Sequence, residues 1–226
     1  MKLTLCVPLI WMLFSSAEAL KCVQEYHWST LQILKDPEPC NSTDVHCATV
    51  SYLDSKIIGE ELYLIRRTCV PSSLCNQGDQ LISFSYDDTG RSVFLHCCST
   101  DGCNDKSIPR LAADEPKPNG LQCDTCSLSD LSCNKKKQCV GNEDRCIAVN
   151  VNEYDETHPL HGCASANLCE GDTELKLKLL FGRSVNIDHV DFSAPKCCET
   201  SLCNSAPSDK LSVISLLLAL VALSVC

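Results

Sequence analysis

The spacing of the cysteines constrains this chain of 226 residues more than any other feature of its sequence. The gaps that recur are six residues in Cys40–Cys47 and Cys139–Cys146, and five residues in Cys69–Cys75 and Cys163–Cys169. Each half of the chain also closes with a Cys-Cys pair, four residues and Cys-Asn, as in Cys97-Cys98 to Cys103-Asn104 and Cys197-Cys198 to Cys203-Asn204. So many equal gaps predict two copies of one small unit.

The number of cysteines indicates a disulfide framework. Of 20 cysteines, Cys6 and Cys226 lie in apolar end segments, and an even set of 18 is left. Such a density is typical of secreted chains that fold in an oxidising compartment. Each small unit buries little core, so we expect the bridges to supply stability, at about 2–4 kcal/mol each.

The N-terminus has the layout of a secretory signal peptide. Lys2 precedes an apolar run from Leu3 to Phe14, and Ala17-Glu18-Ala19 gives a small-x-small cleavage pattern. A membrane anchor is the alternative, but the apolar run is too short to cross a bilayer. We expect residues 1–19 to be removed and Leu20 to come first.

The C-terminus predicts a glycosylphosphatidylinositol (GPI) anchor. Residues Leu211–Cys226 are apolar and uncharged, and no basic tail follows them. Asn204 is the expected attachment residue and Ser205 the second choice, with residues 205–226 removed. The spacer is shorter than usual for such a signal. The alternative is an apolar tail that packs into the domain.

The two units are separated by residues 105–120, which contain three prolines and several charges and are expected to form a linker. The predicted domains are therefore residues 20–104 and 121–204. The net charge of −10 argues against nucleic acid as a partner, because such binding needs a basic surface.

The segments between cysteines alternate as β-strands do. Ile82, Phe84 and Tyr86 alternate with serines, then Asp87–Gly90 forms a turn and Arg91–His96 returns, which predicts a hairpin. The other segments expected to be strands are 48–53 and 61–67, turning near Gly59, with Ile147, Val149 and Val151, and Leu175, Leu177 and Leu179, in the second unit. No helical periodicity is evident, and the fold class is all-β.

Together these residues resemble the Ly6/urokinase-receptor superfamily of three-finger domains. The resemblance rests on the paired closing cysteines, the Cys-Asn ends, and Leu121-Gln122-Cys123 with Cys126, and it covers both units. It implies two tandem three-finger domains, each with three hairpins on a disulfide base. The tandem arrangement with a GPI-type tail is similar to urokinase-receptor-like proteins and two-domain phospholipase A2 inhibitors.

The resemblance also implies the disulfide pairing. In the second domain it gives Cys123–Cys146, Cys126–Cys133, Cys139–Cys163, Cys169–Cys197 and Cys198–Cys203. In the first domain it gives Cys22–Cys47, Cys40–Cys69, Cys75–Cys97 and Cys98–Cys103. Glu25 stands where the first domain's missing bridge would begin, so its first finger is expected to be looser. The terminal asparagine of each domain is expected to tie the chain end to the base.

Several local patterns suggest chemistry but have simpler interpretations. Cys123-x-x-Cys126 is typical of zinc sites, yet an oxidising route and complete pairing favour bridges. Asp88-Thr89-Gly90 matches the aspartic protease triplet but lies at a hairpin turn. His158 and His161 have no nucleophile motif to pair with. We therefore expect no enzyme, no metal and no cofactor.

Two surface features remain. Lys135-Lys136-Lys137 is a basic run that suits an anionic headgroup or an acidic partner, or is simply a solvated loop. Asn41-Ser42-Thr43 is a sequon, which predicts glycosylation of Asn41. The leading hypothesis is a GPI-anchored protein at the outer face of the plasma membrane that binds an unknown extracellular protein. The alternative is a secreted inhibitor of phospholipase A2, and binding of urokinase is a third possibility.

Overall fold

The computed structural model describes residues 19–28, 36–41, 46–54, 63–106, 117–126, 132–153, 156–182 and 190–205. Nearly all of the predicted signal peptide, most of the predicted linker and the apolar C-terminal segment lie outside these residues. No helix within the described ranges is long and apolar enough to span a membrane. The fold is all-β, as the sequence predicts, and consists of two disulfide-rich units of hairpins.

The first domain contains β1 (Lys21–Cys22), β2 (Glu25–Trp28), β3 (Glu38–Pro39), β4 (His46–Asp54), β5 (Tyr63–Val70), α2 (Ser72–Cys75), β6 (Gln80–Tyr86), β7 (Thr89–Cys98) and the 3-10 helix η1 (Cys103–Asp105). The second contains β8 (Pro118–Thr125), β9 (Lys135–Val140), β10 (Arg145–Glu153), β11 (Glu156–Ala164), η2 (Ala166–Leu168), α3 (Thr173–Phe181) and β12 (Val190–Cys198).

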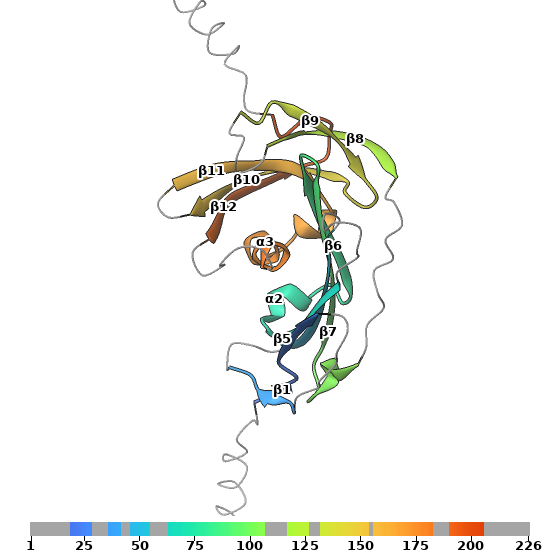
Figure 1. Cartoon of the computed structure of the whole chain (residues 1–226), viewed down its shortest axis with the longest axis vertical. Coiled ribbons are helices and arrows are strands. Elements are labelled where there is room, and N and C mark those ends of the chain that lie inside the picture. The colour runs from blue at the N-terminus through green and yellow to red at the C-terminus, as the bar shows by residue number, and fades with distance from the viewer. Residues whose placement is uncertain are drawn as a thin grey trace, which may run out of the picture.

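The two domains share one sheet. Its strand order is β12-β10-β11-β6-β7-β4-β5-β2, so the hairpin β6–β7 of the first domain continues the sheet of the second. Figure 1 shows that the sheet bends at this junction, with α2 and α3 inside the bend. Finger I of the second domain, β8–β9, forms a separate two-stranded sheet at the end of the molecule opposite β1.

Both hairpins predicted for the first domain are confirmed. β6 and β7 pair as far as Tyr86↔Thr89, which leaves Asp87-Asp88 as a two-residue turn. β4 pairs with β5 from His46↔Val70 to Leu53↔Tyr63, while the predicted turn near Gly59 lies outside the described residues. In the second domain, the predicted strand of alternating Ile147, Val149 and Val151 is β10, and all three side chains are buried.

One prediction of secondary structure is wrong. Residues 175–179 form part of helix α3, not a strand. The Asp172 carboxylate caps the helix by accepting the Leu175 N–H at 2.9 Å, and the buried positions recur with helical period at Thr173, Lys176–Leu177 and Leu180–Phe181. The periodicity was hidden because a lysine occupies a core-facing position, where apolar residues are expected.

Lys176 tolerates this position through hydrogen bonds to the backbone. Its side chain is only 2% exposed, and its ammonium donates to the carbonyls of Asn167 at 2.6 Å and Glu170 at 2.8 Å. Burial lowers the pKa of Lys176, partly offset by the charges of Glu170 and Asp172. The lysine thereby joins α3 to the end of η2.

One hydrophobic core runs through both domains, from Val50 and Ile82 in the first to Val149 and Leu160 in the second. Phe181 of α3 lies at the junction. Its ring centroid is 5.7 Å from that of Phe84 in β6 and 5.3 Å from that of Phe192 in β12. Burying such a side chain is worth about 1.5–3 kcal/mol, so α3 stabilises the junction as well as its own domain.

Nine disulfides hold the bases of the two domains. The bonded pairs are Cys22–Cys47, Cys40–Cys69, Cys75–Cys97, Cys98–Cys103, Cys123–Cys146, Cys126–Cys133, Cys139–Cys163, Cys169–Cys197 and Cys198–Cys203. These are the pairs that the resemblance implies. In each domain three of the bridges gather into a separate cluster, while Cys75–Cys97 and Cys169–Cys197 pack against the main core.

The asparagine after the last cysteine is buried in both domains. The Asn104 side chain accepts the N–H of Val23 and donates to the carbonyls of Val23 and Ala48, at 2.9–3.1 Å. The Asn204 side chain accepts the N–H of Asp124 and donates to the carbonyls of Asp124 and Ile147, at 2.9–3.0 Å. Each side chain therefore connects the end of its domain to the residue after the first cysteine and to a central strand, which is the structural role expected for it.

An ion pair occupies the region of the missing bridge in the first domain. Glu25 of β2 lies opposite Arg67 of β5, and the two side chains form a buried salt bridge. Arg67 also donates to the carbonyl of Lys106 at 3.3 Å, where the described part of the domain ends. A buried charge pair thus links the first finger to the sheet, although residues 29–35 of that finger lie outside the described part.

Candidate binding site at the domain junction

The junction begins where the backbones of β11 and β6 meet. Cys163 and Ala164 pair with Ser85 and Phe84. Gly162 makes this approach possible, because a Cβ at that position would lie 2.1 Å from the carbonyl oxygen of Ser85. In the first domain the residue before the equivalent cysteine is Thr68, so the glycine distinguishes the edge that receives another domain.

Hydrogen bonds extend this contact on both sides. Ser165 N–H donates to the carbonyl of Ser83 at 3.0 Å, and Ser83 N–H donates to the Ser165 hydroxyl at 3.1 Å. The amides of Asn142 and Asn167 donate to the carbonyl of Leu81 at 3.2 and 3.0 Å. The outer strand of the first domain is therefore bonded to two loops of the second.

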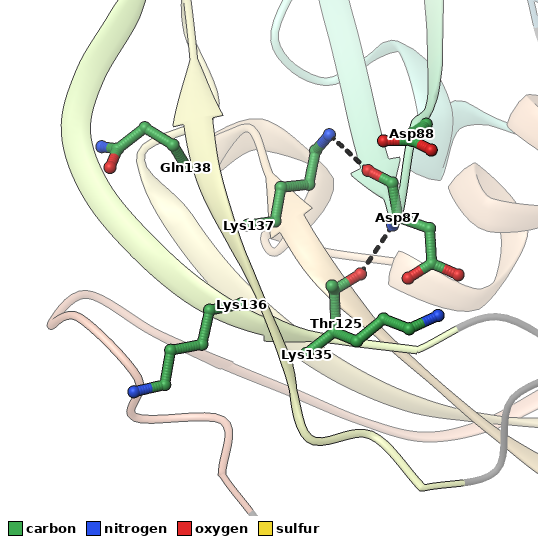
Figure 2. Close-up of a pocket in the computed structure, with 7 residues that line it drawn as sticks. All are labelled: Asp87, Asp88, Thr125, Lys135, Lys136, Lys137 and Gln138. Atoms are coloured by element: carbon green, nitrogen blue, oxygen red, sulfur yellow. Dashed lines mark hydrogen bonds between the residues drawn. The ribbon is translucent and has the colours of Figure 1, made fainter.

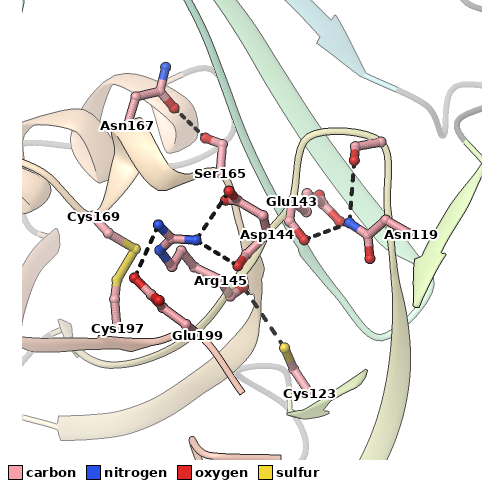
Figure 3. Close-up of polar contacts among 11 residues, drawn as sticks. Asn119, Cys123, Glu143, Asp144, Arg145, Ser165, Asn167, Cys169, Cys197 and Glu199 are labelled. Atoms are coloured by element: carbon pink, nitrogen blue, oxygen red, sulfur yellow. Dashed lines mark hydrogen bonds and ion pairs between the residues drawn. A yellow bond between two sulfur atoms is a disulfide. The ribbon is translucent and has the colours of Figure 1, made fainter. Parts of the chain in front are cut away.

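Glu143 is a buried acidic residue at this junction. It is 4% exposed, and its carboxylate accepts hydrogen bonds from the Ser85 hydroxyl at 2.7 Å and from Val140 N–H at 3.4 Å. Burial raises the pKa of Glu143 above its ordinary value of 4.5, against smaller lowering effects of the Ser85 bond and the charge of Lys137. The Asn119 side-chain amide donates a hydrogen bond to the backbone carbonyl of Glu143 at 2.9 Å (Figure 3).

A second polar contact lies next to Glu143. Arg145 at the start of β10 pairs with Asp144 at 3.1 Å and with Glu199 at 3.2 Å, as Figure 3 shows. Glu199 belongs to the turn that follows β12. The loop carrying Glu143 is therefore fixed to the base of its own domain as well as to β6.

The turn of the β6–β7 hairpin rests on finger I of the second domain. Asp87 has a φ of 43° and donates its N–H to the Thr125 hydroxyl at 2.7 Å. The Lys137 ammonium donates to the carbonyl of Asp87, also at 2.7 Å. Figure 2 shows Lys137 and Thr125 both pointing toward this turn, so β8 and β9 hold the tip of the first domain's third finger.

A polar cavity of about 520 Å³ opens beside this contact. The residues that line it are Asp87, Asp88, Thr125, Lys135, Lys136, Lys137 and Gln138. A smaller cavity of about 230 Å³ adjoins it, sharing Asp88 and Lys137 and reaching Glu143. Because both domains contribute walls, these cavities depend on the junction itself.

The basic run noticed in the sequence is part of this site. Lys135, Lys136 and Lys137 begin strand β9, so they do not form a solvated loop. Lys137 is half-buried by its contact with the turn, whereas Lys135 and Lys136 are exposed. Asp88, from the triplet that resembles an aspartic protease, is the second turn residue and faces the same cavity.

The other candidate residues are not among those that line the cavity, although the backbone carbonyl of His161 accepts a hydrogen bond from the Thr125 hydroxyl at 3.2 Å. His158 and His161 are on β11, and because their separation is odd they point to opposite faces of the strand. His158 contacts Glu156 at 3.2 Å, while burial lowers the pKa of His161 against the opposing charge of Asp124. Cys123 and Cys126 are each bonded in a disulfide.

Sequence reasoning missed most of the junction. Thr125, Gln138 and Glu143 carry no motif, because their importance comes from a neighbouring domain distant in sequence. Gly162 was the one available signal, since an isolated glycine inside a strand indicates a close backbone approach. The turn residue Asp87 was recognised only as a turn former.

The fold and the junction define a class: tandem three-finger proteins in which the two domains form one body. The u-PAR/Ly-6 domain family matches residues 18–106 and 119–206, and the chain therefore belongs to that family. The two matched segments cover most of the chain.

Named relatives include inhibitors and a receptor. A gamma-type phospholipase A2 inhibitor from Elaphe climacophora is 29% identical over 130 residues, covering 55% of this chain and 62% of the relative. The urokinase plasminogen activator surface receptor of Bos taurus is 26% identical over 213 residues, covering 89% of this chain and 58% of the receptor. The chain thus matches about three fifths of the length of these relatives.

Among solved structures, the crystal structure of mouse TEX101 matches with 18% identity and a TM-score of 0.30. The match covers 80% of this chain and 99% of that chain.

Proposed function

We propose that this chain is a GPI-anchored, non-catalytic protein of the cell surface that recognises an extracellular protein ligand through its β-hairpin fingers. The observation that carries this proposal is the shared sheet. Because β6 and β11 pair, the fingers of two domains form one surface of fixed shape. A fixed surface suits recognition, since less order has to be gained on binding. The relatives named as a receptor and as inhibitors support a binding role.

The position of the end of the second domain supports display from a membrane. The turn before Asn204 bonds to β8 through Leu202 N–H and the carbonyl of Gln122 at 2.7 Å. Finger I of the second domain lies at the end of the molecule opposite β1 (Figure 1). An anchor attached at Asn204 or Ser205 would hold the second domain at the membrane and the first domain away from it.

Treatment of expressing cells with phosphatidylinositol-specific phospholipase C tests the anchor. We expect the protein to leave the cell surface, while a version fused to a transmembrane helix stays attached. Mass spectrometry of the released C-terminal peptide identifies the attachment residue. Protein that the enzyme does not release would contradict the proposed anchor. Asn41 is exposed, in keeping with glycosylation, and a mass shift with peptide N-glycosidase tests that modification.

The alternative function is inhibition of phospholipase A2, which the name of the Elaphe climacophora relative favours. Urokinase is the corresponding candidate from the receptor match. Purified protein is tested against each enzyme, by hydrolysis of phospholipid vesicles and by direct binding to immobilised urokinase. If the protein inhibits phospholipase A2 and phosphatidylinositol-specific phospholipase C does not release it from cells, the alternative replaces the first proposal.

A further inference from the structure

The larger junction cavity runs along the free edge of β9. This strand pairs with β8 on one side, and within the described ranges no strand pairs with its other side. Four consecutive residues of β9, Lys135 to Gln138, line the cavity. Side chains in a strand alternate between two faces, so a cavity above one face would be lined by every second residue. A cavity lined by all four, and by Thr125 of β8, covers the face that holds Lys135 and Lys137 and reaches around the edge of β9.

Figure 2 agrees with this placement. Lys135 and Lys137 project to one side of the strand, and Lys136 and Gln138 project to the other. The first side also holds the Asp87-Asp88 turn, which is fixed by Thr125 and Lys137 at 2.7 Å each. The groove therefore has one wall from each domain and exists because the two domains are joined.

A strand edge calls for a particular kind of ligand. Alternate residues of an edge strand turn their N–H and C=O groups away from the partner strand, and another extended chain satisfies these groups by adding to the sheet. Four residues of β9 present about 13 Å of edge, at about 3.3 Å per residue. This length accepts three or four residues of an extended segment.

The other outer edge in the second domain is poorly suited to such pairing. β12 carries Ala194 with a φ of 52°, followed by Pro195, which has no N–H to donate. A bend and a proline both protect an exposed edge from pairing. β9, whose sequence is Lys-Lys-Lys-Gln-Cys-Val, has neither and is protected by its lysines instead, which repel basic strands and leave the edge open to acidic ones.

Charge selects among extended segments. Lys136 is exposed and lies on the side of β9 away from the acidic turn. An acidic side chain beside Lys136 on an added strand would form a favourable cross-strand pair, whereas a basic one would be repelled. On the other side Lys137 is already engaged with the carbonyl of Asp87.

We propose that the free edge of β9 binds an extended segment of a partner protein as an added strand, with an acidic side chain next to Lys136. This inference rests on the proposed binding function and specifies where and how the partner binds. It does not depend on the lipid anchor, so anchor release and edge binding are tested separately.

The test uses mature protein purified from expressing cells and a displayed library of random eight-residue peptides. The best selected peptide is synthesised, together with a copy that is N-methylated at alternate residues and so cannot pair with a strand edge. Affinities are measured for the wild type, for Lys136→Glu, and for the matched control Lys196→Glu, which makes the same charge change on β12. Hydrogen exchange then locates the peptide on the protein.

We expect the selected peptides to be acidic and to slow hydrogen exchange of the amides at Lys135–Gln138. Lys136→Glu should bind the peptide at least tenfold more weakly than the wild type, and Lys196→Glu should bind it like the wild type. The N-methylated peptide should not bind. Equal binding by the N-methylated peptide, protection of another segment, or unchanged affinity of Lys136→Glu would overturn the inference. If no peptide is selected and phosphatidylserine vesicles bind the wild type but not Lys136→Glu, the surface recognises lipid and the inference is also wrong.

Discussion

Replacement of Gly162 by alanine should open the domain junction. The added Cβ would lie 2.1 Å from the carbonyl oxygen of Ser85, 3.0 Å from its carbonyl carbon and 3.3 Å from Tyr86 Cα. All three are backbone atoms, so no side chain can rotate to relieve the overlap, and β6 must move away from β11.

The cost combines overpacking and lost hydrogen bonds. Inserting a methyl group into a packed site costs about 1–3 kcal/mol. The bonds between Ser83 and Ser165 each contribute about 1 kcal/mol, so loss of one of them brings the total to about 2–4 kcal/mol. At tenfold per 1.4 kcal/mol, amides that exchange by opening of the junction should exchange about 30- to 700-fold faster.

Hydrogen exchange measured by mass spectrometry checks this expectation at residues 83–85 and 162–165. The control is Thr68→Ala, which changes the corresponding residue of the first domain, where no second domain pairs with the strand. The disulfides should keep both domains folded, so the change should be confined to the junction. Unchanged exchange in Gly162→Ala would refute the view that close backbone contact holds the domains together.

Three further predictions concern buried polar groups. Because the pKa of Glu143 is raised in the folded protein, its contribution to stability is fullest below pH 4.5 and is lost as the pH rises through the raised pKa. Glu143→Gln should therefore flatten the dependence of the melting temperature on pH. Parallel curves for the variant and the wild type would contradict this. Arg67→Met removes the positive charge that faces buried Glu25 and should cost about 3–5 kcal/mol, whereas the double variant Glu25→Leu/Arg67→Met should cost less. Denaturant midpoints measure both losses, and a larger loss in the double variant would exclude the pairing. Asn204→Ala removes three hydrogen bonds of about 1 kcal/mol each and should lower the unfolding free energy by about 2–4 kcal/mol, as should Asn104→Ala. Calorimetry measures both losses. A loss below about 0.5 kcal/mol would show that water replaces these bonds.

The sequence predicted the parts of the fold that depend on local patterns. Period-two alternation identified β6 as a strand because Ile82 and Phe84 face the core and the turn follows directly. The same reasoning failed at α3, where the spacing of Leu175, Leu177 and Leu179 imitates a strand. Capping by Asp172 and the hydrogen bonds of buried Lys176 stabilise the helix, and the bonds of Lys176 depend on neighbouring structure.

The candidate site was less predictable than the fold. The missing bridge at Glu25 was visible from the cysteine spacing, but the pairing of this residue with Arg67 joins residues 42 positions apart. The lysine run on β9 was noticed, yet the cavity beside it depends on the turn at Asp87, which belongs to the other domain. Contacts between domains leave little trace in a single sequence, apart from glycines such as Gly162.

The shared sheet has a consequence for synthesis of the protein. Strand β6 is complete at Tyr86, but its partner β11 ends at Ala164, so the ribosome must add nearly 80 residues before the edge of β6 is covered. At about 5–20 residues per second this takes roughly 4–16 s, during which an unpaired strand edge is open to other nascent chains. The first domain therefore emerges with an exposed strand edge, part of which the second domain later covers.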